Sequence, residues 1–159
     1  MGHHDGVTAI AFNADGSQMI TGSFDTDVRI WETNTGKKLN VFSGHNDRVV
    51  TVQFIPNSPL IISGSNDRSI RLWNVDTGFV MYRYQAHTDR VLRVYPSRDG
   101  HFMISTVMDG HIFFWVIPPR LEEMVAWARA NRYVRPLTCA EENLYLASGR
   151  DCSASEATE

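Results

Sequence analysis

The sequence has little cysteine, no excess of charge of either sign and no long apolar run. Its 159 residues include only two cysteines, Cys139 and Cys152, too few for a disulfide framework and typical of the reducing cytosol. A formal net charge of −3 lacks the basic footprint of a nucleic-acid-binding protein. No apolar run approaches the roughly 18 residues that a membrane helix needs. We therefore expect a cytoplasmic protein with neither nucleic acid nor a membrane as its partner.

What the sequence does contain is a repeat of 42 residues. Trp31 recurs as Trp73 and as Trp115, each 42 positions further on. Three more columns keep the same step, one of histidine, one of threonine or serine and one of aspartate: His3, His45 and His87; Thr21, Ser63 and Ser105; Asp25, Asp67 and Asp109. A period in the forties is typical of the blades of a β-propeller.

Each repeat consists of short runs rich in β-branched and aromatic residues, separated by turn-forming Asn, Asp, Gly and Pro. This pattern predicts successive antiparallel strands, and four of them make one propeller blade. The expected strands are 7–12, 18–23, 27–31 and 38–42, then 49–54, 60–65, 69–73 and 79–84, then 90–95, 101–106 and 111–116. The third repeat lacks its outer strand, because Pro118 and Pro119 stand where that strand belongs. The predicted fold class is all-β, a partial propeller at 2–117 with blades at about 2–43, 44–85 and 86–117.

Beyond the repeats the hydrophobic period changes. Leu121, Met124, Val125 and Ala128 fall at i, i+3, i+4 and i+7, which predicts an amphipathic helix. Thr138 and Glu141 have the spacing of a capping box, so a second short helix is expected after Pro136. We predict a helical C-terminal extension at 118–148 and a disordered tail at 149–159, where the residues are small, polar and acidic.

Several stretches of the repeats resemble the WD-repeat family of β-propellers over about residues 2–116. They are Gly2-His3, Gly44-His45, 21–25 with 28–31 (TGSFD and VRIW), 63–67 with 70–73 (SGSND and IRLW), and a weaker copy at 105–115. The aspartate that follows the tryptophan in the family's name is absent, since Glu32, Asn74 and Val116 stand there. The resemblance implies a buried hydrogen-bonded network in each blade: His3, Thr21, Asp25 and Trp31; His45, Ser63, Asp67 and Trp73; His87, Ser105, Asp109 and Trp115.

A hydrolase is the catalytic alternative for these residues, because Ser63, His45 and Asp67 could supply a nucleophile, a base and an orienting carboxylate. The same set occurs three times in the chain, and an enzyme rarely builds three identical sites in one small domain. The structural interpretation is therefore preferred, with no catalytic residue and no cofactor. A metal site is not expected either, because His4, His101 and His111 lack cysteine partners and tight His-x-His spacing.

The segment Trp127–Cys139 is similar to segments that close the WD-repeat regions of large bacterial signalling proteins, which often carry a STAND-type NTPase or a protein kinase upstream. The sequence itself has no phosphate-binding Gly-rich loop and no kinase signature. Within the segment, Arg129, Arg132 and Arg135 form either a solvated helix face or a surface for an acidic partner. Cys139 could have a lowered thiol pKa at a helix N-terminus, although an incidental structural role is preferred.

The resemblance also implies a partner-binding face, at the blade end that bears the turns before each first strand and between the second and third strands. The residues expected there are Gly6, Thr8, Phe24, Arg48, Val50, Asn66, Arg90, Leu92 and Met108. Aromatic, Met and Arg side chains are enriched at interfaces, although ordinary solvent exposure is the alternative for any single member. Arg48 and Arg90, one blade apart, could together hold an acidic or phosphorylated segment.

Propellers close with about four to eight blades, so three blades predict an incomplete arc. The chain resembles the C-terminal piece of a longer propeller, completed by blades of another chain or of a second copy. The first functional hypothesis is a non-catalytic scaffold or sensor for a protein or peptide partner in bacterial-type signalling. The alternative is a structural propeller that closes by homo-oligomerisation.

Overall fold

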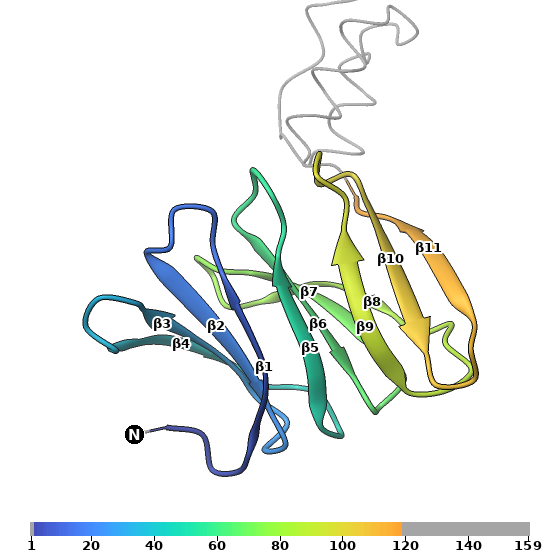
Figure 1. Cartoon of the computed structure of the whole chain (residues 1–159), viewed down its shortest axis with the longest axis horizontal. Coiled ribbons are helices and arrows are strands. Elements are labelled where there is room, and N and C mark those ends of the chain that lie inside the picture. The colour runs from blue at the N-terminus through green and yellow to red at the C-terminus, as the bar shows by residue number, and fades with distance from the viewer. Residues whose placement is uncertain (1, 119–159) are drawn as a thin grey trace, which may run out of the picture. The chain divides into compact units, whose positions relative to one another are not determined.

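The computed structural model describes residues 2–118, which form three antiparallel sheets and no helix (Figure 1). The predicted all-β class is confirmed. The helical extension predicted at 118–148 and the tail at 149–159 lie outside the described residues, apart from Pro118. Within residues 2–118 there is accordingly no helix that could cross a membrane.

The first sheet, blade 1, contains β1 (Val7–Phe12), β2 (Gln18–Ser23), β3 (Val28–Glu32) and β4 (Lys38–Phe42) in that order. Blade 2 contains β5 (Val49–Phe54), β6 (Leu60–Ser65), β7 (Ile70–Asn74) and β8 (Val80–Tyr84). Blade 3 has three strands within the described residues, β9 (Val91–Pro96), β10 (Phe102–Val107) and β11 (Ile112–Val116). Each strand pairs with the next one along the chain, so every blade is a meander.

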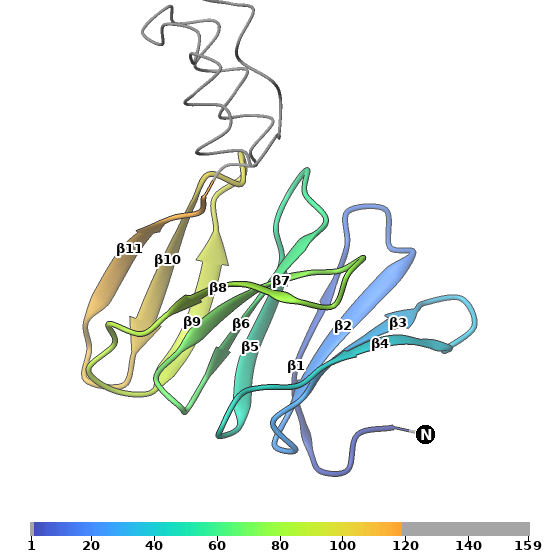
Figure 2. The ribbon, with the colours of Figure 1, turned by 180° about the vertical axis from the view of Figure 1, so that it is seen from behind.

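The three blades follow one another side by side, with β1 next to β5 and β5 next to β9 (Figures 1 and 2). We call the side of a blade that faces the preceding blade its front face, and the opposite side its back face. Two apolar cores lie between the blades. The back face of blade 1 and the front face of blade 2 enclose Ile20, Val28, Ile30, Phe42, Val49, Val52, Ile61 and Trp73. The next core includes Ile62, Ile70, Leu72, Tyr84, Val91, Val94 and Met103.

Glycine in the second strand allows the blades to approach closely. A Cβ atom at Gly22 would lie 2.7 Å from Val49 Cγ1, and one at Gly64 would lie 2.7 Å from Val91 Cγ1. Such distances are too short for carbon atoms in van der Waals contact. At the equivalent position of blade 3 the residue is Thr106. The back face of blade 3 therefore differs from the two back faces that are packed.

Candidate functional site

In blade 2 the four network residues form one continuous chain of hydrogen bonds. Trp73 Nε1 donates to Ser63 Oγ (2.8 Å), and Ser63 Oγ lies 2.7 Å from His45 Nε2. His45 Nδ1 is 2.8 Å from Asp67 Oδ2. With the Nδ1 proton directed at the carboxylate, Nε2 accepts from the serine hydroxyl. The network joins β6, β7 and the segment before β5, so it holds three parts of the blade in register.

Blade 1 repeats this arrangement and adds an arginine. Trp31 Nε1 donates to Thr21 Oγ1 (2.8 Å), which lies 2.6 Å from His3 Nε2, and His3 Nδ1 is 2.9 Å from Asp25. Arg29 is buried on β3 and reaches the same carboxylate at 3.1 Å. Arg29 also contacts Asp27 (3.4 Å) and donates to the carbonyl of Gly2.

Blade 3 connects only three of its four expected members. Trp115 Nε1 donates to Ser105 Oγ (2.8 Å), which lies 2.8 Å from His87 Nε2. His87 Nδ1 instead points to the carbonyl of Arg68 (3.2 Å) in the preceding blade. The physical reason lies on β11, where Phe113 replaces the arginine of the other blades and packs edge-on against the His87 ring, with centroids 5.0 Å apart.

The aspartate of blade 3 makes local contacts of its own. The Asp109 carboxylate accepts from the hydroxyl of Thr88 and pairs with His111 Nδ1 at 2.9 Å. It lies at the exposed tip of the β10–β11 turn, beside Met108. The network position is therefore occupied by the predicted residue, but its side chain stabilises the turn rather than the histidine.

Burial and hydrogen bonding set the charge state of the networks. Burial lowers the pKa of His45 and outweighs the opposing attraction of Asp67. Burial alone would raise the pKa of Asp67, but hydrogen bonds from His45, Ser69 and the backbone amide of Asn46 hold it well below its usual range. The balance is similar at Asp25, whose pKa falls to about 2. At neutral pH the His45–Asp67 pair therefore consists of a neutral imidazole and a charged carboxylate.

These networks do not present a nucleophile to a substrate. The Ser63 side chain is fully buried, and its hydroxyl oxygen already receives the Trp73 N–H. A reacting carbonyl would have to reach Ser63 through the packed core between the blades. Within residues 2–118 no group of three His, Cys, Asp or Glu side chains is arranged to hold a metal ion.

The predicted partner face is built from pairs of residues that the backbone brings together. The amide of Phe24 donates to the carbonyl of Gly6 (2.9 Å). At the equivalent positions, the amide of Asn66 donates to the carbonyl of Arg48 (3.0 Å), and the amide of Met108 donates to the carbonyl of Arg90 (3.0 Å). In each blade, therefore, one residue of the turn between the second and third strands lies beside the residue that directly precedes the first strand.

Side chains on this face differ in exposure and in role. Phe24, Arg48, Arg90, Leu92 and Met108 are exposed, and Met108 is the most accessible hydrophobic residue among them, with 65% of its surface free. The other expected members include Val50, which is half-buried, and Thr8, whose hydroxyl bonds the carbonyl of Gly22 (3.0 Å) and that of Val49. The Thr8 hydroxyl therefore ties blade 1 to blade 2.

One contact on this face joins two blades. The guanidinium of Arg48 lies over the ring of Phe24, 4.3 Å from its centroid. The two residues are 24 positions apart and belong to different repeats, so the 42-residue register offers no signal for their stacking. This contact holds a cation at the junction of blades 1 and 2, and a guanidinium over an aromatic ring can still donate hydrogen bonds to an acceptor.

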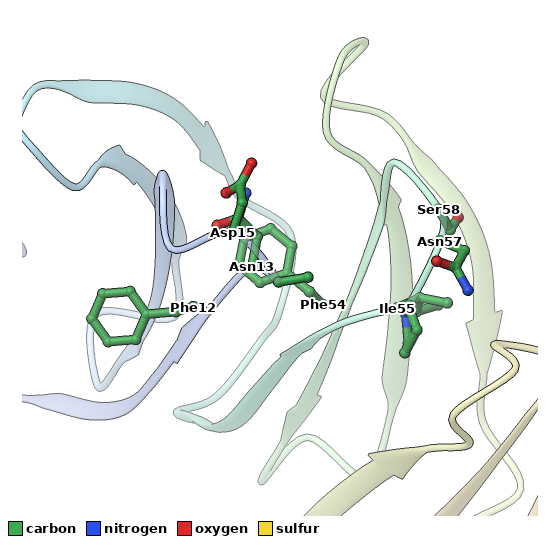
Figure 3. Close-up of a pocket in the computed structure, with 9 residues that line it drawn as sticks. Phe12, Asn13, Asp15, Phe54, Ile55, Asn57 and Ser58 are labelled. Carbon is green, nitrogen blue, oxygen red and sulfur yellow. The ribbon is translucent and has the colours of Figure 1, made fainter.

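A cleft that the sequence analysis did not anticipate lies at the opposite end of the same two blades. It has a volume of about 460 Å³ and is lined by the β1–β2 and β5–β6 turns: Phe12, Asn13, Ala14, Asp15, Phe54, Ile55, Pro56, Asn57 and Ser58 (Figure 3). Asp15 is its only charged residue, and that carboxylate accepts from the backbone amide of Ser17 (2.8 Å). The cleft therefore offers mainly apolar surface.

Comparison with known proteins agrees with this architecture. The chain matches the family described as WD domain, G-beta repeat, in three segments, residues 1–32, 36–74 and 78–116. It is also similar to "Mitochondrial division protein 1" of Chaetomium globosum, with 41% identity over 39 residues. That stretch covers 24% of this chain and 6% of the fungal protein, so the likeness is to a single repeat of a much longer protein. The three family segments cover well over half of the sequence and coincide with the three blades, and the chain belongs to the WD domain, G-beta repeat family.

Proposed function

We propose that the chain is a non-catalytic scaffold or sensor module whose partner is an acidic or phosphorylated protein segment. WD repeats are in general protein-interaction scaffolds. The observation that carries it is the stack of Arg48 on Phe24. Arg90 occupies the equivalent place on blade 3, so two exposed guanidinium groups line the same end of the blades.

The chemistry of these groups defines the partner. Guanidinium groups bind carboxylate and phosphate oxygens through paired hydrogen bonds. Phe24 and Met108 add apolar surface on either side, and aromatic and Arg residues dominate binding energy at many interfaces. An extended segment with two negative groups spaced for neighbouring blades fits this face.

The wider setting of the proposal is cytoplasmic signalling of the bacterial type. It rests on the resemblance of Trp127–Cys139 to the closing segments of large signalling proteins, and any NTPase or kinase activity would reside elsewhere. In this arrangement the three blades, at about 2–43, 44–85 and 86–117, supply recognition, and the helical extension predicted at 118–148 lies outside the described residues apart from Pro118.

The test is a triple substitution, Phe24→Ala, Arg48→Ala and Arg90→Ala, in the full chain. We expect binding of acidic and phosphoserine peptides, measured by fluorescence anisotropy, to fall at least tenfold while the melting temperature stays unchanged. The matched control is Lys37→Ala with Arg98→Ala, which removes two exposed cations from turns at the opposite end of the blades. Undiminished peptide binding by the triple variant would contradict the proposal.

Self-assembly is the second candidate function, supported by exposed apolar faces on the outer blades. On the front face of blade 1, Val7 and Ile10 are 51% and 57% exposed, whereas Val49 and Val52 at the same positions of blade 2 are buried. On the back face of blade 3, Ile112 and Phe114 are 70% and 66% exposed, whereas their blade 2 counterparts are buried. Surfaces of this kind fit other blades, from a second copy or from another polypeptide.

A further inference from the structure

A buried arginine on the third strand of blades 1 and 2 has different surroundings in the two blades. In blade 1, Arg29 is fully neutralised. Its Nη2 lies 3.1 Å from Asp25 and 3.4 Å from Asp27, and its Nη1 donates to the carbonyl of Gly2. One arginine thus faces two carboxylates. In blade 3 the position holds Phe113, so no charge is present there.

In blade 2 the equivalent Arg71 has lost one of these carboxylates. Ser69 stands where blade 1 has Asp27, and its hydroxyl bonds Asp67 Oδ1 (2.6 Å). The other oxygen of Asp67 is taken by His45 and by the amide of Asn46. Within residues 2–118 the Arg71 side chain makes neither a hydrogen bond nor an ion pair, although it is only 8% exposed.

The surroundings of Arg71 compensate its charge only weakly. The Nε atoms of Arg29 and Arg71 are both buried without a partner, so the two arginines differ at their terminal nitrogens. Those of Arg29 are paired, whereas those of Arg71 are unpaired within residues 2–118 and remain within reach of solvent. The guanidinium lies 5.7 Å from the Trp73 ring centroid and against Gly44. A buried charge that lacks a partner is strongly destabilising, because the loss of hydration is not recovered.

A second arginine stands directly opposite. In the β7–β8 register Arg71 pairs with Arg83, whereas in blade 1 Arg29 pairs with the neutral Val41. The Gln85 amide oxygen, in the orientation that satisfies the amide, accepts from Arg83 Nη2 (2.7 Å) and adds no negative charge. Like charges opposite one another destabilise a sheet. Burial and the nearby Arg83 accordingly lower the pKa of Arg71.

We propose that Arg71 and Arg83 form a binding site for a phosphoryl group at the outer strands of blade 2. The site contains two arginines and one carboxylate, Asp67, whose oxygens already accept from other groups. Blade 1 has the opposite ratio, with one arginine and two carboxylates. Two guanidinium groups on neighbouring strands can each direct paired N–H donors at a tetrahedral oxyanion. The bound anion would replace the carboxylate that Asp27 supplies in blade 1 and would separate the two cations. This site uses none of the residues of the proposed partner face.

The experiment measures thermal unfolding of the full chain while inorganic phosphate is titrated against sodium chloride of equal ionic strength. We expect phosphate to raise the melting temperature by about 2 °C or more beyond the chloride series, because a ligand that binds only the folded state stabilises it. An equal response to phosphate and to chloride would overturn the proposal.

Two variants, each of which places the blade 1 residue at the equivalent position of blade 2, test whether the phosphate effect arises at this site. Ser69→Asp restores the missing carboxylate and Arg83→Val restores the neutral neighbour, so both are compatible with the fold. We expect each to abolish the phosphate-specific shift, and Ser69→Asp to raise the melting temperature in phosphate-free buffer. Arg98→Ala, at an exposed turn, is the matched control and should keep the full response. A phosphate-specific shift that survives in Arg83→Val would place the anion elsewhere and refute the site.

A calorimetric titration then distinguishes the source of the phosphoryl group. The titration uses a chain that carries Arg48→Ala and Arg90→Ala, so that the proposed partner face does not contribute. Tighter binding of a phosphoserine peptide than of inorganic phosphate, lost when Arg83→Val is added, assigns the site to a modified protein segment. Equal affinity, lost in the same variant, assigns it to the free anion. Absence of heat from both ligands contradicts the proposal.

Discussion

In each blade, the hydroxyl group of a residue on the second strand is hydrogen-bonded to both a tryptophan and a histidine. The distances agree closely, since the indole nitrogen lies 2.8 Å from the hydroxyl in all three blades. The carboxylate beyond the histidine is more variable. The Asp25 and Asp67 side chains are nearly buried and contact the histidine, whereas Asp109 is 27% exposed and pairs with Thr88 and His111 instead. Single residues therefore differ in how much they contribute, according to their burial and to the number of partners they would leave unpaired.

Trp73→Ala should be one of the most damaging single substitutions. Trp73 is 1% exposed, packs 5.7 Å from the Phe42 ring and donates to buried Ser63. Loss of the ring and of the hydrogen bond should lower the free energy of unfolding by about 3–5 kcal/mol. Urea unfolding followed by circular dichroism measures this. Trp73→Phe, which keeps a ring but no donor, should cost less, and an alanine variant as stable as the parent would show that the network is not a stabilising unit.

Acidification should destabilise the fold in two windows. Burial lowers the pKa of His45 and of His87, so the unfolded chain binds these protons more readily. The stability they confer is present above about pH 6.5 and is lost as the pH falls through their folded pKa values, by up to about 1.4 kcal/mol per pH unit for each histidine. Asp25 and Asp67, with lowered pKa values, contribute stability that is lost below about pH 4.

Urea midpoints at pH 7.5, 6.5 and 5.5 test the first window. A midpoint that is constant over this range would mean that protonation of the buried histidines is not coupled to unfolding.

At the scale of the strand, the second strand of each blade determines how closely the next blade can pack. Gly22 on β2 and Gly64 on β6 lack the Cβ atom that would collide with a valine of the following blade. In the sequence these glycines are only members of the stretches TGSFD and SGSND. The packing of the sheets against one another gives them their role.

Gly22→Ala should weaken the packing between blades 1 and 2. The new methyl group would lie 2.7 Å from Val49 Cγ1 and 3.1 Å from Val52 Cγ1, and overpacking of this kind costs about 1–3 kcal/mol. Denaturant unfolding measures the loss. Gly22→Ala combined with Val49→Ala should recover part of it, because the space is restored. Gly2→Ala, where nothing lies within 4 Å, is the matched control, and equal effects of the two glycine substitutions would refute the packing argument.

At the scale of the whole set of blades, the two outer faces are not equivalent. The front face of blade 1 carries Val7 and Ile10 in the register of the packed Val49 and Val52. The back face of blade 3 has Thr106 in the place of the two glycines and Phe114 in the place of Leu72. A blade that docks on this back face as blade 3 docks on blade 2 would meet the Thr106 side chain.

Thr106→Gly should therefore strengthen association between copies, if copies dock in this manner. We expect the parent chain to associate with itself at micromolar concentration or to require complementary blades, because its outer faces are apolar. The variant should sediment as larger species at lower concentration than the parent. Compact monomers in both cases would exclude self-assembly through these faces and would leave the scaffold function as the proposal.

The 42-residue register determined much of what the structure contains. It placed strands such as 7–12, 49–54 and 60–65 at the bounds that the structure shows, because alternation and turn residues are local properties of the chain. The WD-repeat resemblance grouped His45, Ser63, Asp67 and Trp73 from these columns into one network, and their atoms lie within hydrogen-bonding distance. Identical spacing in a repeat produces identical positions within each blade.

Only the tertiary structure decided which side chains meet between strands and between blades. The stack of Arg48 on Phe24 and the hydrogen bond between His87 and the carbonyl of Arg68 join residues of different blades. Arg71 and Arg83 lie opposite one another on the neighbouring strands β7 and β8. These contacts depend on the distance between neighbouring sheets and on which acceptors compete for one donor. Both depend on tertiary packing, which the sequence pattern does not show. A single exchange, such as Ser69 for the aspartate of blade 1 or Phe113 for its arginine, redirects the hydrogen bonds around it while the backbone of the blade stays the same.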